Sequence, residues 1–259
     1  MECAIRLKGV FLEYSGTTAL RGVDWVVGEG ESWAVIGPNG AGKTSLMSII
    51  DGYAWPSRGD VEILGNRFGE TDLRELRTRI GMVSAYLEGW IPGDEKVLDL
   101  VMSGKYGSTR IWRKAPPGEV RRAASLLQSL GCGDQVRKMV KELSQGERQK
   151  VMIARALMAN AALLLLDEPC EGLDLGAREQ FLDGLTLLAG RGRTAMVYVT
   201  HRTDEIPSGF THALLLKSGK VLASGPIEET LTGRNLSSCY GVNVRLKTVN
   251  GRYYTIVSG

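Results

Sequence analysis

A glycine-rich stretch of the sequence could hold a chain of phosphates. Residues 37–44 read GPNGAGKT and follow the pattern G-x-x-x-x-G-K-[ST] between an apolar run and a helix-like run. Glycines let backbone N–H groups turn inward around phosphate, and a helix N-terminus adds the positive end of its dipole. Lys43 is then placed for the β- and γ-phosphates and the Thr44 hydroxyl for Mg²⁺. We predict nucleotide contacts, with Lys43 also catalytic, at Gly37, Pro38, Asn39, Gly40, Ala41, Gly42, Lys43, Thr44 and Ser45.

Two carboxylates end the most apolar run of the chain. Residues 163–169 read LLLLDEP, so Asp167 and Glu168 follow four consecutive leucines. An acid at the end of a buried strand can hold Mg²⁺ directly or through water, and we assign this role to Asp167. Glu168, one residue further, is placed to accept a proton from an attacking water. The alternative, a helix cap followed by a first-turn acid, fits poorly with so apolar a strand.

A second helix N-terminus also looks ready for an anion. Residues 143–151 read LSQGERQKV, a small polar turn followed at once by a helix-like run. Ser144 offers a hydroxyl, Gly146 allows a close backbone approach, and the helix contributes its dipole. The first phosphate-binding stretch lies far upstream, so one nucleotide site does not explain both. An ordinary capped helix is the alternative.

Strands alternate with helices around these residues, which predicts an α/β fold with a mostly parallel sheet covered by helices. The predicted strands are Ile5–Phe11, Val23–Val27, Ser32–Ile36, Val61–Leu64, Ile80–Val83, Ala162–Leu166, Thr194–Val199 and Ala213–Leu216. The predicted helices are Thr44–Ile50, Leu73–Arg79, Lys96–Met102, Glu119–Leu130, Gln145–Met158 and Leu175–Leu188. The all-helical part from about 86 to about 160 indicates an inserted helical subdomain. Residues 242–257 predict a β-hairpin, because Asn250-Gly251 is a strong turn signal between two β-prone runs.

The composition is that of an ordinary globular protein, and the net charge of +3 is too small to predict nucleic-acid binding. The four cysteines form no CxxC pair, which argues against a zinc site and a disulfide framework and fits a reducing cytosol. The first residues do not form a secretory signal, and the longest apolar run falls far short of the ~20 residues that span a bilayer. We therefore expect a cytoplasmic protein that does not cross a membrane by itself.

The order of these motifs, followed by a lone histidine after the next strand (YVTH, ending at His201), resembles the nucleotide-binding subunit of an ABC-type ATPase. Asp167 follows Ser144 by 23 residues, and His201 follows Glu168 by 33 residues, which agrees with that family. The resemblance covers roughly residues 1–235. It implies a P-loop NTPase core with N-terminal antiparallel strands as one ATPase domain, and leaves 236–259 as a C-terminal hairpin extension.

The resemblance also implies how the second helix N-terminus is used. In that family the turn completes the nucleotide site of a second copy, head to tail, so that ATP joins two subunits and hydrolysis releases them. Ser144, Gly146 and Glu147 would then contact the γ-phosphate of a partner's ATP, and Asp174 would lie in the loop that crosses the interface. By the same resemblance Tyr14 stacks on adenine and His201 touches the γ-phosphate. His212 has no such match and is predicted to be a surface or packing residue.

The sequence departs from the family at three positions. Ala85 stands where the family places a glutamine that contacts Mg²⁺ or the attacking water and faces the membrane partner. Either Ser84, Tyr86 or Glu88 replaces it, or the metal keeps an additional water; our hypothesis is that Thr44, the phosphates and waters hold Mg²⁺, with weaker coupling to transport. The other two departures are Gln145 in place of glycine and Glu171 in place of a small residue.

The resemblance implies an ATP-hydrolysing, Mg²⁺-dependent subunit of a membrane transporter, most simply an importer. We expect a dimer with a second ATPase subunit, a separate transmembrane permease, a peripheral position on the inner face of the cell membrane and no direct contact with nucleic acid. The altered loop at Ala85 and the terminal hairpin resemble those of iron-chelate and molybdate uptake cassettes. Two alternatives are a soluble ABC ATPase without a membrane partner, linked to ribosomes or nucleic acid, and a P-loop kinase or switch.

Overall fold

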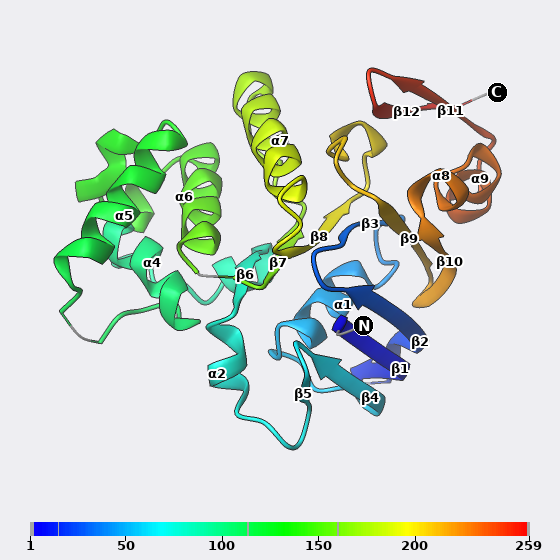
Figure 1. The fold of residues 1–259 in the computed structure, drawn as a ribbon, viewed down its shortest axis with the longest axis horizontal. Helices are drawn as coiled ribbons and strands as arrows, with labels where there is room; N and C mark the ends of the chain where they lie inside the picture. Colours follow the sequence, from blue (N-terminus) through cyan, green and yellow to red (C-terminus); the bar gives the residue numbers. More distant parts are fainter. Residues whose placement is uncertain (1–2, 15, 113, 160, 258–259) are drawn as a thin grey trace. The chain divides into compact units, whose positions relative to one another are not determined.

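The computed structural model describes residues 3–14, 16–112, 114–159 and 161–257 (Figure 1). It separates into two compact units, of which unit 1 comprises Met1–Thr71 and Leu182–Gly259 and unit 2 comprises Asp72–Phe181. Among the described residues no helix is both long enough and apolar enough to span a bilayer. The domain boundaries predicted from the sequence, at residue 235 and at about 86 and 160, stay predictions.

Unit 1 begins with an antiparallel sheet whose strands pair in the order β2-β1-β4-β5. Its strands are β1 (Cys3–Tyr14), β2 (Thr17–Gly28), β4 (Arg58–Ile63) and β5 (Asn66–Arg67). Burial alternates along β1 at Ile5 and Leu7 and resumes one residue out of phase at Val10 and Leu12. The register shifts between Leu7 and Val10, where Gly9 has φ 56°, so a β-bulge accounts for the change of phase. The predicted N-terminal antiparallel strands are confirmed, and they are longer than the sequence indicated.

The second sheet of unit 1 contains the strands that lead to the predicted nucleotide site. Its strands are β3 (Ser32–Ile36), β8 (Ala195–Thr200), β9 (His212–Lys217) and β10 (Lys220–Pro226). β3 pairs in parallel with both β8 and β9, while β10 forms an antiparallel pair with β9. Every residue of β3 and β8 is buried, as expected for central strands of a parallel sheet. Helix α1 (Lys43–Ile50) follows β3 after the glycine-rich stretch.

The chain of unit 1 ends in two short helices and a hairpin. These elements are α8 (Ile227–Thr230), α9 (Gly233–Tyr240), β11 (Val244–Val249) and β12 (Arg252–Val257). β11 and β12 pair in the antiparallel sense, and Asn250 and Gly251 between them have φ 50° and 74°. Positive φ at both turn residues is what the Asn-Gly signal demands, so the predicted hairpin is confirmed.

Unit 2 contains a parallel pair of buried strands, β6 (Ile80–Val83) and β7 (Leu163–Asp167), with helices between them in sequence. The helices are α2 (Leu73–Arg77), α3 (Ala85–Glu88), α4 (Val97–Ser103), α5 (Pro117–Ser129) and α6 (Gln145–Met158). α6 packs against α4 and α5, the group coloured green in Figure 1, and its apolar side is fully buried. The predicted helical insert is therefore confirmed. Helix α7 (Leu175–Ala189) begins in unit 2 and ends in unit 1.

Candidate functional site

The glycine-rich stretch forms a tight loop between β3 and α1, and each of three glycines is required there. Gly40 and Gly42 have φ 77° and 101°, conformations that residues with a Cβ rarely adopt. A Cβ on Gly37 would lie 2.2 Å from the carbonyl oxygen of Leu216. Any side chain at the first position of the loop would therefore clash with the backbone of β9. The loop therefore folds as the phosphate-binding pattern requires.

The start of α1 offers its backbone N–H groups to an anion. Gly42 occupies the N-cap without a side-chain cap, and the first turn contains no acidic residue. Lys43 is only 6% exposed, and its Nζ donates to the carbonyl oxygens of Gly37 at 2.8 Å and Pro38 at 3.3 Å. The ammonium group thus lies over the loop, close to where a phosphate chain would be held.

Unit 1 also carries the predicted adenine and γ-phosphate contacts. Tyr14 is the last residue of β1 and is 49% exposed. Strand β2, which pairs with β1, packs on the phosphate loop, because a Cβ on Gly42 would lie 2.7 Å from the carbonyl oxygen of Ala19. His201 follows β8 directly, is exposed, and its carbonyl oxygen accepts a hydrogen bond from Tyr240 Oη at 3.2 Å. His212 stacks on Trp33 with ring centroids 4.7 Å apart, which confirms it as a packing residue.

The two predicted acids lie at the end of β7 in unit 2. Asp167 is the last residue of the strand and is 9% exposed. Glu168 adopts φ 49°, a left-handed conformation that is uncommon for a residue with a side chain and is disfavoured before a proline. The carbonyl oxygen of Pro169 accepts a hydrogen bond at 2.7 Å from Nε2 of Gln149 on α6. Backbone strain of this kind clusters at functional sites, which agrees with the role predicted for Glu168.

The turn at the start of α6 is a reciprocal capping box between Ser144 and Glu147. Ser144 Oγ accepts from the Glu147 N–H at 3.3 Å, while Glu147 Oε2 accepts from the Ser144 N–H at 2.8 Å and from its hydroxyl at 2.9 Å. A Cβ on Gly146 would lie 2.9 Å from the carbonyl oxygen of Gly172, so glycine is required by close approach of the loop after Pro169. Gln145 is the first helical residue and has no positive φ, so its departure from glycine causes no strain here.

Two further side chains hold the Glu147 carboxylate. Gln135 Nε2 donates to Glu147 Oε1 at 2.6 Å, and Lys138 Nζ lies 3.4 Å from the same oxygen. Hydrogen bonds from the Ser144 backbone, from Gln135 and from the Ser144 hydroxyl together lower the pKa of Glu147 to about 2. The carboxylate is therefore ionised at neutral pH and fixes the turn that presents Ser144.

This environment predicts how Glu147→Gln changes stability with pH. A depressed folded pKa adds stability above the unfolded value of 4.5, and that stability is lost as pH falls through 4.5 toward about 2. Urea unfolding from about pH 7 to about pH 3 should show wild type more stable than Glu147→Gln by a constant amount at the neutral end and by a shrinking amount at the acidic end. A difference that keeps its size across the whole range would contradict this account of the turn.

Asp174 caps helix α7. Its Oδ1 accepts a hydrogen bond from the backbone N–H of Ala177 at 2.9 Å, and this bond lowers the pKa of the Asp174 carboxyl. The side chain is exposed, so the cap leaves it accessible to a partner. The structure therefore gives Asp174 a local role in addition to the interface role predicted for it.

The residues around Ala85 are engaged in local structure. Ala85 begins α3, and Ser84 Oγ accepts from the Leu87 N–H at 3.2 Å as the helix cap. Glu88 pairs with Arg148 Nη1 on α6 at 3.2 Å. These two side chains, which were considered as replacements for the missing glutamine, thus have structural partners. The third, Tyr86, packs edge-on against Trp90 with ring centroids 6.2 Å apart.

The predicted residues divide between the two units. Unit 1 contains the phosphate loop, Tyr14 and His201, and unit 2 contains the turn at Ser144, the acids after β7 and Asp174. Sequence reasoning did not find Gln135, Gln149 and Tyr240, whose partners lie 12, 20 and 39 residues away, and no local pattern marks them.

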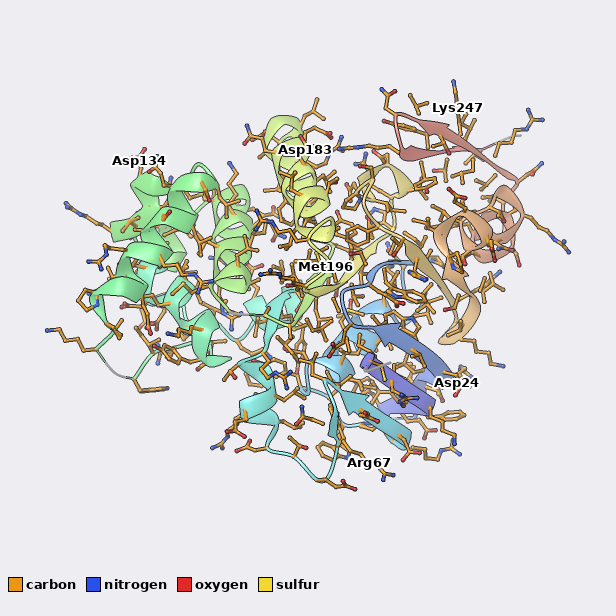
Figure 2. The ribbon with its side chains drawn as sticks, viewed as in Figure 1. Asp24, Arg67, Asp134, Asp183, Met196 and Lys247 are labelled. Atoms are coloured by element: carbon orange, nitrogen blue, oxygen red, sulfur yellow. The ribbon has the colours of Figure 1, made fainter. Side chains whose placement is uncertain are left out.

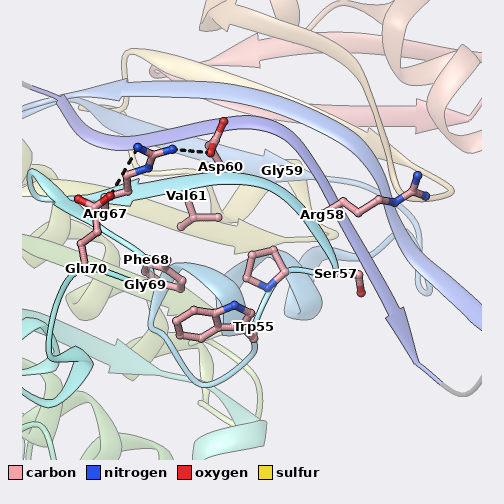
Figure 3. A pocket seen from close by; sticks show the side chains of 11 residues that line it. Trp55, Ser57, Arg58, Gly59, Asp60, Val61, Arg67, Phe68, Gly69 and Glu70 are labelled. Atoms are coloured by element: carbon pink, nitrogen blue, oxygen red, sulfur yellow. Dashed lines mark hydrogen bonds and ion pairs between the residues drawn. The ribbon is translucent and has the colours of Figure 1, made fainter.

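A cavity of about 420 Å³ lies elsewhere in unit 1, beside β4 and β5 (Figure 3). Trp55 and Phe68 form an aromatic pair on its wall, and Arg67 is paired there with Asp60 and Glu70. None of the predicted site residues lines it. The cavity is therefore separate from the predicted nucleotide-binding residues.

Comparison with known proteins agrees with this arrangement. A family model described as ABC transporter matches residues 20–171. The ABC transporter ATP-binding protein YlmA of Bacillus subtilis is 40% identical over 93% of this chain and 92% of its own length. The manganese transport system ATP-binding protein MntB of the same organism is 33% identical over 92% of both chains.

The fold is similar to that of a solved dimeric cassette. The ATP-binding cassette MJ0796, in a post-hydrolysis state bound to ADP and Pi, superposes with a TM-score of 0.76. It is 27% identical, and the match covers 86% of this chain and 98% of the other. The α/β fold with an antiparallel N-terminal sheet, parallel strands and a helical insert is thereby confirmed.

Proposed function

The chain belongs to the ABC transporter family of ATP-binding, ATP-hydrolysing cassettes, and we propose that two copies of it bind two ATP molecules at shared sites between them. The observation that supports this best is the start of α6, where Ser144 and Gln145 are exposed at the N-terminus of a 14-residue helix. Such a helix end attracts an anion. The dimeric relative MJ0796 supports an identical second copy as the source of that anion.

In this proposal each ATP contacts two chains. Tyr14 stacks on adenine, and the loop from Gly37 to Ser45 surrounds the phosphates, with Lys43 moving from its own loop carbonyls to the β- and γ-phosphates. Ser144 and Gly146 of the second copy close the site over the γ-phosphate, and Glu147 acts there through its backbone and through the turn that its ionised carboxylate holds. Asp174 lies at the interface between the copies.

The residues present fit Mg²⁺. Asp167 ends β7, and Thr44, an exposed residue, lies in the first turn of α1. A carboxylate and a hydroxyl both supply oxygen ligands of the kind that Mg²⁺ prefers. We assign the ion to Asp167 and Thr44, with phosphate oxygens and waters completing its shell in place of the glutamine that Ala85 lacks. When bound, Mg²⁺ neutralises charge on the β- and γ-phosphates.

Hydrolysis then depends on two further side chains of the same copy. Glu168 accepts the proton of the attacking water. Its backbone, which has φ 49°, follows directly after the buried strand β7, and this position determines where the carboxylate lies. His201 contacts the γ-phosphate and orients that water. Hydrolysis removes the γ-phosphate that joins the copies, so the dimer separates.

The relatives support a role in import. MntB is the ATP-binding protein of a manganese transport system. The phosphonates import ATP-binding protein PhnC 1 of Rhodopseudomonas palustris is 34% identical over 92% of this chain and 86% of its own length. We therefore assign the chain to an importer, where a separate transmembrane permease holds it on the cytoplasmic face of the membrane. Ala85 in place of the usual glutamine favours one competing role, a soluble ABC ATPase without a membrane partner.

Uptake measurements separate these two roles. The source organism would carry either the wild-type gene or Glu168→Gln at its native locus. Uptake of manganese, phosphonate and zinc, which the names of similar ATP-binding proteins print, would be measured in both strains. An importer predicts that one of these uptake rates falls in the variant and that the wild-type protein sediments with membranes. Unchanged uptake together with a protein that remains in the supernatant would favour the soluble role.

A further inference from the structure

Two side chains from the C-terminal part of the chain donate hydrogen bonds to the loop that contains His201. Tyr240 Oη donates to the carbonyl oxygen of His201 at 3.2 Å, and Arg252 Nη1 donates to the carbonyl oxygen of Asp204 at 3.4 Å. Both carbonyls belong to the segment between β8 and β9, where η4 (Thr203–Glu205) forms a short turn of 3₁₀ helix. Two side chains from beyond residue 235 thus contact the backbone of the predicted γ-phosphate loop.

Tyr240 has a fixed position because α9 is anchored on β9. Cys239 is buried, and its Sγ donates to the carbonyl oxygen of Leu216 at 3.6 Å. Lys217 Nζ donates to the carbonyl oxygen of Ser238 one residue earlier. The helix ends at Tyr240, because Gly241 adopts the left-handed conformation with φ 73°. The phenol therefore projects from a helix end that is tied to the sheet.

Arg252 is placed by the hairpin, which is tied to α9 in turn. Ser237 Oγ accepts from the Val244 N–H at 2.8 Å and donates to the carbonyl oxygen of Gly233 at 2.7 Å, which joins the start of β11 to the helix. β12 packs against η4, and Arg252 is its first residue. The opposite strand carries Lys247, labelled on the hairpin in Figure 2.

The loop itself is organised by a network of side-chain contacts that has a buried part and an exposed part. Thr200 is 1% exposed, and its hydroxyl donates to Glu205 Oε2 at 3.0 Å and accepts from the Arg202 N–H at 3.0 Å. Arg202 also pairs with Asp204 at 2.8 Å. His201 lies within this network with an exposed side chain. The imidazole therefore projects from a stretch of backbone that Tyr240 and Arg252 contact.

We propose that Tyr240 and Arg252 are positioning residues that make the C-terminal segment a brace for His201. The brace fixes the His201 backbone before ATP arrives, so that the imidazole needs no reorganisation to meet the γ-phosphate. The proposal rests on the role proposed above for His201. It gives the terminal hairpin a function in hydrolysis, which the sequence did not reveal.

Single conservative variants test the brace. Tyr240→Phe is expected to lower kcat by about fivefold, the rate equivalent of one neutral hydrogen bond, and Arg252→Gln, which removes a bond from a charged guanidinium, by at least about fivefold. Both should leave the KM for ATP and the thermal midpoint unchanged. The matched controls are Tyr254→Phe, at a residue that is 41% exposed on β12, and Arg245→Gln, at an exposed residue on β11. Both controls should hydrolyse ATP at the wild-type rate.

A double-mutant cycle decides whether Tyr240 acts through His201. If it does, Tyr240→Phe has no further effect on kcat in a His201→Ala background, measured with radiolabelled ATP over long incubations. A fivefold loss in that background as well would overturn the proposal, and so would wild-type hydrolysis by Tyr240→Phe while His201→Ala is slow. Wild-type hydrolysis by His201→Ala would instead contradict the proposed role of the histidine itself.

Discussion

Glu168→Gln is expected to slow ATP hydrolysis by about 10³-fold and to change ATP affinity by less than about twofold, because an amide cannot accept the proton of the attacking water. Glutamine has nearly the same shape, so it can keep the left-handed backbone that Glu168 adopts and the packing of the following loop. ATP binding uses the phosphate loop, which this change does not touch. Phosphate release and equilibrium nucleotide binding measure the two effects separately.

Glu171→Gln is the matched control. Glu171 is an exposed acid on the same loop, three residues from Glu168, and we assign it no part in proton transfer. It should hydrolyse ATP within about twofold of wild type. If Glu168→Gln retained more than about a tenth of the wild-type rate, another group would have to be the base, and the assignment of Glu168 would be wrong.

Ser144→Arg is expected to lower kcat for ATP hydrolysis by at least about 10²-fold, because it prevents the second copy from closing over the nucleotide. The change removes the hydroxyl and places a long side chain at the exposed start of α6, where the partner's γ-phosphate must approach. A single chain should still bind ATP, because its own phosphate loop is intact. Steady-state hydrolysis and nucleotide binding to the same preparation distinguish loss of assembly from loss of binding.

The control has to separate this effect from the loss of a helix cap. Ser144 caps α6, and removing such a cap costs about 1 kcal/mol of stability. Ser144→Thr keeps both the cap and the hydroxyl and should retain most of the activity. Ser144→Arg should still unfold cooperatively in a thermal scan. Wild-type hydrolysis by a folded Ser144→Arg protein would contradict the shared site.

The phosphate loop and the start of α6 could be predicted because their function depends on short local patterns. Position 37 has no room for a Cβ, and positions 40 and 42 have positive φ, so all three need glycine. Ser144 and Glu147 form their capping box within four residues. The apolar run before Asp167 likewise marked a buried strand without any tertiary information. Local rules of backbone geometry and burial were sufficient for these elements.

The supporting contacts could not be predicted, because they join residues that are distant in sequence. Gln149 meets Pro169, Gln135 meets Glu147, and Tyr240 meets His201 only after the strands and helices are in place. Strand β1 was predicted only over Ile5–Phe11 for a similar reason, since its exposed last residues, Glu13 and Tyr14, are marked as strand only by their pairing with β2. The roles of the site residues toward ATP and Mg²⁺ stay predictions until they are tested.

The most direct test of the shared site is sedimentation of Glu168→Gln with and without Mg·ATP. This variant should keep ATP bound, so the proposal predicts a monomer without nucleotide and a dimer with it. Adding Ser144→Arg to the same chain should restore the monomer in the presence of ATP. A Glu168→Gln protein that binds ATP and remains monomeric would contradict the claim that two copies of this chain close over the nucleotide.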